Sequence, residues 1–161
     1  MFKLLKRHGK LIKVTALSRL HQEIRQPLRQ RLDEVYGQDV HMEGKWMIAC
    51  EEKLKELTGR KHVHMVTSGT SALMLMFMAL GIDQGDRVIC INHSIPSSVM
   101  PPKLLGADLI FSDINKHGQQ DLTGIDKEDV KAIMTTGLYG DCHDHDLIAD
   151  LGIPVINDSC Q

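Results

Sequence analysis

The amino-acid sequence predicts an α/β fold, a mostly parallel β-sheet with helices on both faces. Two observations lead to this prediction. From residue 61 onward, short apolar runs alternate with helical segments, which is typical of parallel sheets whose strands are buried on both sides. The polar turn Thr67–Ser71 follows one of these runs and opens the apolar run Ala72–Leu80, an order that indicates strand, turn and helix. Ligands of such sheets bind at the carboxyl ends of the strands, so a site is expected there.

The composition is that of an ordinary globular domain and gives no sign of a nucleic-acid or membrane partner. Of the 161 residues, 42% are hydrophobic and 25% are charged, and the formal net charge is −2. No apolar run reaches the roughly 18–20 residues that a membrane span needs. The four cysteines form no CxxC pair and are predicted to be free thiols of a cytoplasmic protein; they are Cys50, Cys90, Cys142 and Cys160.

Residues 1–44 form the first of two predicted domains, an N-terminal arm followed by a helix. Met1–Val14 alternates basic and apolar residues, which favours a solvated or partly ordered arm over the alternative, a helix on a membrane surface. Ser18–Tyr36 has the pattern of a helix that begins with a serine N-cap. Pro27 is expected to kink or divide this helix, and Gly37 is expected to end it.

Residues 45–161 form the second predicted domain, which begins with a helix over Lys45–Leu57 that is ended by Gly59. The strands predicted after this helix are Val63–Val66, Arg87–Ile91, Leu109–Phe111, Ala132–Met134 and Pro154–Ile156. The helices predicted between and after them are Ser71–Leu80, a short one over Pro101–Leu105, and His145–Leu151.

The turn before Ala72 has the features of an anion-binding site. The first backbone N–H groups of a helix have no partner within the helix, and the helix dipole favours an anion there. The hydroxyls of Ser68, Thr70 and Ser71 add donors, and Gly69 lets the backbone approach a ligand closely. Serine and threonine are also ordinary N-caps, so the same residues fit a capped core helix, and the turn alone leaves both interpretations open.

Asp158 directly follows the last predicted strand and is the second candidate site residue. A carboxylate at this position can hold a metal, a sugar hydroxyl or a protonated ring nitrogen. It can equally cap a turn, because Asp158-Ser159 suits that role. The residue types leave these alternatives open.

The histidine-rich segments are weaker candidates. His62 and His64 lie on one side of a predicted strand, and Cys142–Asp146 is rich in metal-type ligands. A zinc site needs about four converging ligands, and consecutive residues of a short loop rarely all reach one ion. No metal site is therefore predicted. His93 lies in a loop after a strand, where a pocket position and a surface position are equally open.

An ordered series of motifs resembles the sugar aminotransferases of the DegT/DnrJ/EryC1/StrS family. The matching segments are Thr67–Ile82, Gly85–Ile89, Leu105–Ala107, Phe111–Ile114, Leu138–Gly140 and Pro154–Gln161. The resemblance runs from about Gly44 to the last residue. It implies a pyridoxal-phosphate (PLP) enzyme of the aspartate-aminotransferase fold type I, of which this sequence holds the N-terminal part of the large domain.

The resemblance also implies roles for single residues. Gly69, Thr70 and Ser71 match the turn that cups the cofactor phosphate. Asp158 matches the carboxylate that pairs with the pyridine nitrogen, where a neighbouring anion keeps the ring protonated and electron-withdrawing. Gln161 matches a residue near the phenolic oxygen of the cofactor.

Two positions depart from the family's pattern. Ile95 stands where the family usually stacks an aromatic ring on the cofactor, and an aliphatic side chain can pack on the ring without π-stacking. Pro101 and Pro102 stand where the family has an ordinary helix. Because proline is tolerated at the start of a helix and not inside it, this helix is predicted to begin late or to be shortened.

The lysine that binds the cofactor covalently in the family lies beyond the last matching segment, so no catalytic residue is assigned within this sequence. Without that lysine the chain alone is expected to have no aminotransferase activity. The family's enzymes move an amino group from an amino acid to a nucleotide-linked keto-sugar, for surface polysaccharides, O-antigen or antibiotics. The complete enzymes are cytoplasmic homodimers.

Three alternatives to a sugar aminotransferase stay open. One branch of the family replaces the lysine by histidine and performs dehydration. The chain could instead be a non-catalytic remnant, or half of a split enzyme that needs a partner chain. A stand-alone phosphate or nucleotide binder is the least favoured alternative.

Overall fold

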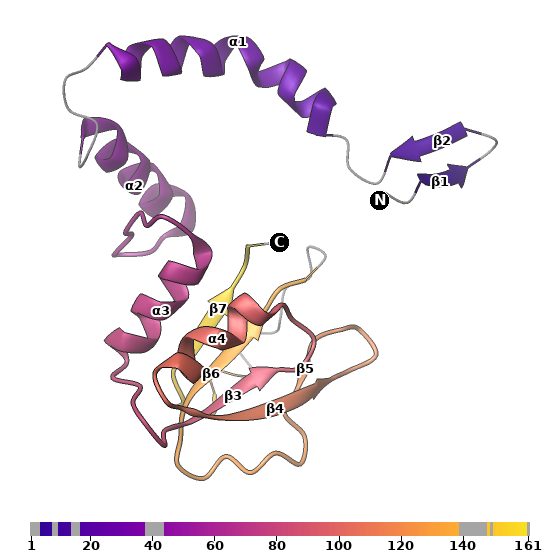
Figure 1. Ribbon diagram of the computed structural model, residues 1–161, viewed down its shortest axis with the longest axis vertical. Coiled ribbons are helices and arrows are strands. Elements are labelled where there is room, and N and C mark those ends of the chain that lie inside the picture. The colour runs from indigo at the N-terminus through magenta and orange to yellow at the C-terminus, as the bar shows by residue number, and fades with distance from the viewer. Residues whose placement is uncertain are drawn as a thin grey trace. The chain divides into compact units, whose positions relative to one another are not determined.

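Figure 1 shows the computed structural model of the protein, which describes residues 4–7, 10–13, 17–37, 44–138, 148 and 150–160. The chain forms two compact units, Met1–Met65 and Val66–Gln161. The boundary between the units follows Met65, whereas the sequence predicted a domain boundary after residue 44. All the predicted cofactor-binding residues belong to the second unit, so the architecture of that unit positions the site.

The first unit contains a two-stranded hairpin and two helices. Its elements are β1 (Leu4–Arg7), β2 (Lys10–Lys13), α1 (Leu17–Tyr36) and α2 (Lys45–Thr58). The strands are antiparallel and pair Leu5 with Ile12. The alternative of a helix on a membrane surface is therefore wrong for these residues, which form strands. A glycine between two short apolar runs, here Gly9, is a hairpin signal.

The two helices of this unit end where the sequence predicts. α1 continues through Pro27 and ends before Gly37, but it begins at Leu17, so Ser18 lies inside the helix and the prediction that it is the N-cap is wrong. α2 ends at Gly59, which adopts a left-handed conformation with φ of 67° and donates its N–H to the Lys55 carbonyl at 2.9 Å.

The segment Val63–Val66 is not a strand, and this prediction is wrong. Strands exist only through hydrogen bonds to a neighbour, and within the described residues no strand pairs with this segment. The backbone N–H of Met65 instead donates to Oε1 of Glu51 at 2.9 Å. Val63–Val66 therefore has the composition of a strand but is not part of a sheet.

The second unit is built on a five-stranded sheet with the order β5-β4-β3-β6-β7. Its strands are β3 (Arg87–Ile91), β4 (Asp108–Ile114), β5 (Gln120–Asp121), β6 (Val130–Thr136) and β7 (Val155–Asp158). The pairs formed by β3, β4, β6 and β7 are parallel, and β5 is antiparallel to β4. The predicted α/β fold with a mostly parallel sheet is confirmed, and β5 is the strand that sequence reasoning missed.

The strand order defines where this sheet can bind a ligand. β4 pairs with one side of β3, and β6, the next long strand in the chain, pairs with the other side. The order therefore reverses between β3 and β6. In open α/β sheets, ligands bind outside the carboxyl ends of the strands at such a switch point. A ligand site of this sheet is therefore expected at the segments that follow β3 and β6.

The centre of the sheet is buried on both faces. Val88 and Cys90 of β3 belong to a cluster that includes Phe77 of α3 (Gly69–Ala79), and Ile89 belongs to the opposite cluster with Ile148. α3 and α4 (Pro96–Leu104) cover the first face (Figure 1). Burial raises the pKa of the Cys90 thiol to about 12, so this thiol stays protonated at neutral pH. The predicted helix His145–Leu151 falls largely outside the described residues.

The helix α4 begins at Pro96 and contains both Pro101 and Pro102, so the prediction of a late start is wrong. Proline at the first helical position is favourable because its fixed φ suits a helix and its missing N–H has no helical partner there. Pro101 and Pro102 are fully buried, and the apolar burial of their rings offsets the loss of two helical N–H donors. Tertiary contacts therefore override the local preference.

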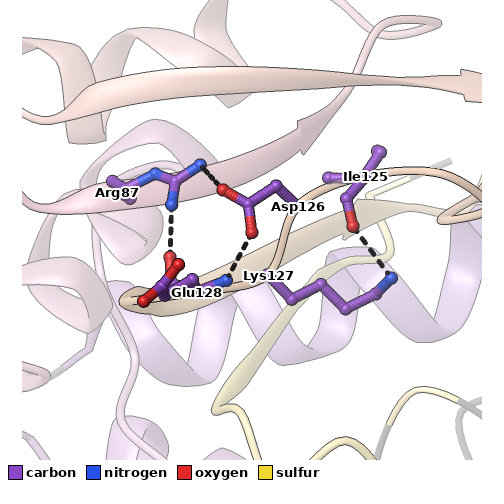
Figure 2. Close-up of polar contacts among 5 residues, drawn as sticks. All are labelled: Arg87, Ile125, Asp126, Lys127 and Glu128. Atoms are coloured by element: carbon purple, nitrogen blue, oxygen red, sulfur yellow. Dashed lines mark hydrogen bonds and ion pairs between the residues drawn. The ribbon is translucent and has the colours of Figure 1, made fainter.

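Charged residues tie the amino end of β3 to the loop before β6 (Figure 2). Nη2 of Arg87 lies 3.0 Å from Oδ2 of Asp126, and Nη1 of Arg87 donates to the Glu128 carbonyl. The Glu128 N–H donates to Oδ1 of Asp126 at 3.0 Å, and Nζ of Lys127 donates to the Ile125 carbonyl at 3.2 Å. Hydrogen bonds from Glu128 and Arg87 hold the pKa of Asp126 below its usual value.

A second ion pair at the same end of the sheet joins Lys131 to Asp86. Nζ of Lys131 lies 2.7 Å from Oδ2 of Asp86 and also donates to the Gly81 carbonyl at 2.5 Å. The hydrogen bond from Lys131, followed by one from the Asp83 backbone, holds the pKa of Asp86 below its usual value.

These two aspartates make the stability of the second unit depend on pH. A carboxylate whose pKa is lowered by folding stabilises the folded state above the unfolded pKa, here 3.8, and that stabilisation is lost as the pH falls through the folded pKa. We expect the urea midpoint of unfolding, followed by circular dichroism, to stay level from pH 7 to about pH 5 and to fall as the pH drops further toward about pH 3. The Asp86→Asn, Asp126→Asn double variant should show a flatter profile.

Asp108→Asn is the matched control for this pH profile. Asp108 is exposed on β4, and no described residue forms an ion pair with it. Its substitution should leave the slope unchanged, and an equal flattening in this control would contradict the role assigned to the two ion pairs.

Candidate functional site

The N-terminus of α3 is capped and retains unpaired backbone donors. Oγ of Ser68 accepts a hydrogen bond from the Ser71 N–H at 3.1 Å, and the Ser68 carbonyl accepts one from the Ala72 N–H at 3.0 Å. The N–H groups of Gly69 and Thr70 remain, and no described residue accepts from them. Both residues are exposed. This end of the helix can therefore donate to an anion along the favourable direction of the helix dipole.

The hydroxyl groups of this turn have two different surroundings. Oγ of Ser71 lies 2.9 Å from Oγ of Ser68 and 3.2 Å from Oγ1 of Thr67, so its hydroxyl bonds within the turn. Thr70 is exposed, and no described residue bonds its hydroxyl. The Ser71 network holds the shape of the turn, whereas Thr70 is free to meet a ligand.

Ser68 allows a test that separates stability from anion binding. Ser68→Ala removes the N-cap acceptor and should lower the unfolding free energy by about 1 kcal/mol. Ser68→Asp keeps a good cap and should keep stability, but its negative charge should repel an anion at the same helix end. Urea unfolding checks the first effect, and a phosphate-ligand titration checks the second. Equal stability of Ser68→Ala and the wild type would contradict the cap.

Asp158, at the end of β7, is a buried carboxylate that is held at both oxygens. Its side chain is 8% exposed. Oδ2 accepts a hydrogen bond from Oγ of Ser98 at 2.7 Å, and Oδ1 accepts one from the Cys160 N–H at 3.2 Å. An ionised carboxylate has about four acceptor sites, so this one retains capacity for a further donor. A buried anion with such capacity is suited to a cationic or N–H-bearing ligand.

Short contacts bring the candidate segments together at the carboxyl edge of the sheet. A side chain at Gly69 would meet Sγ of Cys160 at 2.9 Å, so glycine permits the end of β7 to lie against the start of α3. The Gly137 N–H donates to the Asp158 carbonyl at 3.0 Å. Oγ of Ser94 donates to Oγ1 of Thr136 at 3.1 Å, which joins the segment after β3 to the end of β6 at the switch point.

The structure places most of the predicted site residues at this edge. Gly69, Thr70 and Ser71 form the first turn of α3, and Asp158 ends β7. Ile95 is the N-cap residue of α4 and is 47% exposed, so its side chain is available to a ligand. Gln161 and Cys142–Asp146 lie outside the described residues. The individual roles of the predicted residues remain predictions.

Sequence reasoning missed two residues that complete the site. Ser98 donates to Asp158 although 60 positions separate them, and no local pattern signals such a pairing. Sγ of Cys160 lies 2.9 Å from where a Cβ atom at position 69 would be, and the backbone N–H of Cys160 donates to Asp158. Cys160 is exposed, but a hydrogen bond of its thiol to the Asp158 carboxylate, followed by partial desolvation, raises the pKa of the thiol, so it is a poor nucleophile.

The histidine-rich candidates provide no further site within the described residues. His62 and His64 are both exposed and belong to the first unit. Among the residues that the structure describes, no three His, Cys, Asp or Glu side chains are arranged to hold a metal ion. None of the described helices is both long and apolar enough to cross a membrane.

Comparison with known proteins identifies the family. The family model described as the DegT/DnrJ/EryC1/StrS aminotransferase family matches residues 22–161. The chain belongs to this family. This confirms the resemblance that the motifs indicate. The motifs place the start of the resemblance at about Gly44, whereas the family model already matches from residue 22.

Two curated relatives carry the names of enzymes of nucleotide-linked sugars. The chain is 34% identical over 119 residues to UDP-2-acetamido-2-deoxy-3-oxo-D-glucuronate aminotransferase of Pseudomonas aeruginosa, which covers 69% of the chain and 33% of that protein. It is 32% identical over 134 residues to GDP-perosamine synthase of Vibrio cholerae, which covers 76% of the chain and 35% of that protein. The chain thus spans about a third of the length of these relatives.

Solved structures share the fold. DesV of S. venezuelae superposes with a TM-score of 0.84 at 24% identity, over 90% of the chain and 41% of DesV. GDP-4-keto-6-deoxymannose-3-dehydratase, solved with a trapped PLP-glutamate geminal diamine, superposes with a TM-score of 0.68 at 27% identity, over 73% of the chain and 34% of that structure. The fold is that of PLP-dependent aminotransferases of fold type I, and PLP is the cofactor of the DegT/DnrJ/EryC1/StrS family.

The residues of this edge fit PLP at both of its ends. The phosphate needs hydrogen-bond donors, and the exposed N–H groups of Gly69 and Thr70 at the start of α3 can supply them. The pyridine nitrogen needs an anionic partner when it is protonated, and Asp158 is a buried carboxylate with remaining acceptor capacity.

Proposed function

We propose that the carboxyl edge of this sheet binds PLP as the N-terminal part of a nucleotide-sugar aminotransferase. The observation that carries the proposal is the buried, doubly hydrogen-bonded carboxylate of Asp158 beside the open N-terminus of α3. An anion-binding helix end and a buried anion so close together suit a ligand that is negative at one end and positive at the other. Membership of a PLP-dependent family supports the same ligand.

At the phosphate end, Gly69 and Thr70 would donate their backbone N–H groups to the phosphate oxygens. The exposed Thr70 hydroxyl would add a donor, and Ser71 would keep the turn in shape through its contact with Ser68. Backbone donors at a helix N-terminus cost no reorganisation, because α3 already holds them in place.

At the ring end, Asp158 would accept a hydrogen bond from the protonated pyridine nitrogen. Bound PLP supplies an electron sink for the carbanion that forms during amino-group transfer, and this sink depends on a protonated ring. An adjacent buried carboxylate favours the protonated form. Ile95 would pack on the ring face through its exposed aliphatic side chain, and Gln161 would lie near the phenolic oxygen.

The proposed reaction moves an amino group from an amino-acid donor to a nucleotide-linked keto-sugar. The support is that both curated relatives named above are enzymes of nucleotide-linked sugars, one a UDP-sugar aminotransferase and the other GDP-perosamine synthase. We place the enzyme in the cytoplasm as a homodimer that serves surface-polysaccharide, O-antigen or antibiotic synthesis.

Covalent anchoring of the cofactor needs a residue outside the segments that form this edge. The segments that the contacts described above join there, residues 67–71, 92–98, 135–138 and 158–160, contain no lysine, and Lys116, in the turn after β4, is exposed to solvent. We therefore expect the 161-residue chain to bind the cofactor without catalysing transfer. Mixing the chain with PLP, glutamate and a keto-sugar nucleotide should produce no amino-sugar by mass spectrometry, and turnover would contradict this part of the proposal.

Calorimetric titration with pyridoxamine phosphate tests the binding proposal. This form of the cofactor has no aldehyde, so it cannot react with surface lysines. We expect it to bind at least about tenfold more tightly than pyridoxamine, because charge-assisted hydrogen bonds to the phosphate are lost in the latter. Ser68→Asp should reduce this difference. Equal affinity for the two ligands, or no binding of either, would overturn the proposed function.

Sugar dehydration is the second candidate function, because the solved GDP-4-keto-6-deoxymannose-3-dehydratase superposes on the chain at 27% identity. The two reactions share the phosphate and ring contacts proposed above and differ at one position, where transfer uses a lysine that anchors the cofactor and the dehydration branch has a histidine that does not. This test needs an active enzyme in which the chain is joined to the part that supplies this residue: with ¹⁵N-labelled glutamate, a transferase incorporates label into the sugar, whereas a dehydratase yields an unlabelled deoxy-sugar.

A further inference from the structure

The buried hydroxyl of Ser98 is the feature of this edge that no motif explains. Ser98 lies in the first turn of α4 and has no exposed surface. Its N–H donates to the Ile95 carbonyl at 3.0 Å, as expected at this position in a helix. A serine hydroxyl inside a helix usually bonds to a nearby carbonyl of its own helix. Here it leaves the helix and donates to Oδ2 of Asp158 at 2.7 Å.

The second donor to this carboxylate comes from a different element. The Cys160 N–H reaches Oδ1 of Asp158 at 3.2 Å from the segment after β7. The terminal torsion of an aspartate side chain is soft, so one anchor leaves the carboxylate free to swivel. Two anchors, one on each oxygen and from two elements, fix the plane of the carboxylate.

The fixed plane matters because a hydrogen bond to a ring nitrogen is directional. The donor hydrogen prefers to lie near the plane of the acceptor group, and the interaction weakens steeply as the angle closes. The Ser98 hydroxyl also compensates the burial of a charge that would otherwise lack a donor on that oxygen. The short distance is typical of a charge-assisted hydrogen bond.

We propose that Ser98 is a positioning residue, which orients the Asp158 carboxylate toward the ring nitrogen of the bound cofactor. The proposal rests on the proposed function and adds to it a residue that acts through Asp158. A purely structural Ser98 would stabilise the fold and leave ligand selectivity unchanged. A positioning Ser98 would change the recognition of the ring nitrogen in particular.

The test compares two ligands that differ only at that nitrogen. Pyridoxamine phosphate and its 1-deaza analogue, which carries C–H in place of the ring nitrogen, are titrated into the 161-residue chain by calorimetry. Both ligands meet the same folded population, so the ratio of their dissociation constants is insensitive to partial unfolding of a variant. This ratio is the readout that a merely structural role would not change.

We expect the wild type to prefer pyridoxamine phosphate by about tenfold or more. Ser98→Ala should lower this preference by about fivefold, with the affinity for the deaza analogue unchanged. Ser98→Thr keeps the hydroxyl and should restore the preference. Ser97→Ala, which removes a neighbouring hydroxyl of the same helix turn, is the matched control and should keep the wild-type ratio.

The outcomes distinguish the positioning role of Ser98 from the pairing of Asp158 with the ring nitrogen. A wild-type preference that persists in Ser98→Ala, or a loss that Ser98→Thr does not restore, overturns the positioning role and leaves the proposed function standing. A wild type without any preference for the ring nitrogen overturns the pairing of Asp158 with the ring, and this inference with it.

Discussion

Replacing Asp158 by asparagine is expected to weaken the binding of pyridoxamine phosphate by about 10–100-fold, the range of one charge-assisted hydrogen bond. Asparagine has the shape of aspartate and can keep both neighbours, because its amide oxygen can accept from the Cys160 N–H and its NH₂ can donate to Oγ of Ser98. The fold should therefore survive. The negative charge that favours a protonated ring is lost.

The same titration with the 1-deaza analogue shows whether the loss concerns the ring nitrogen. Asp158→Asn should bind the two ligands within about threefold of each other, since neither then gains from a charged partner. Asp126→Asn, at the amino edge of the sheet beside Arg87, is the matched control and should bind as the wild type does. An unchanged affinity in Asp158→Asn would contradict the assignment of this residue to the cofactor.

Leu73→Ala is expected to lower the unfolding free energy of the second unit by about 2–5 kcal/mol. Leu73 is 4% exposed and belongs to the core cluster between α3 and the sheet, so its truncation leaves a cavity that the surrounding strands can only partly fill. A loss of this size is comparable with the whole stability of many domains, and the variant should be largely unfolded at modest urea concentrations.

Leu75 provides a matched control for this prediction in the same helix. Its side chain is 53% exposed, so Leu75→Ala should change the unfolding free energy by about 0.5 kcal/mol or less. Circular dichroism is the suitable probe, because the single tryptophan, Trp46, lies in the first unit. Equal losses in Leu73→Ala and Leu75→Ala would contradict the orientation of α3 on the sheet.

The sequence predicted the elements whose signals are local. The apolar runs at β3, β4, β6 and β7 are short and bounded by turn residues, and each became a parallel strand. The run after Gly69 became α3, because small polar residues precede a continuous apolar segment. The local signals failed where a distant partner decides the outcome. Val63–Val66 has strand composition and no strand beside it.

The helix α4 is the opposite case, in which local signals oppose an element that nevertheless forms. Pro101 and Pro102 oppose a helix locally, yet the burial of both rings in the folded unit stabilises one. At the site, the sequence indicated the two ends of the ligand, the turn Gly69–Ser71 and the carboxylate of Asp158, from residue types and their places relative to the strands. It gave no sign of Ser98, because a serine in a helix has many possible partners.

By itself, the sequence determined the chemistry of this protein's candidate site: a helix start that can hold an anion and a carboxylate at the end of a strand. Residue types and short-range periodicity carry that information. Only the tertiary structure decided which strands are neighbours, that the order reverses at β3, and that Ser98 meets Asp158 across 60 residues of chain. These features arise from long-range pairing and burial, which depend on the whole fold and leave no mark in any single stretch of sequence.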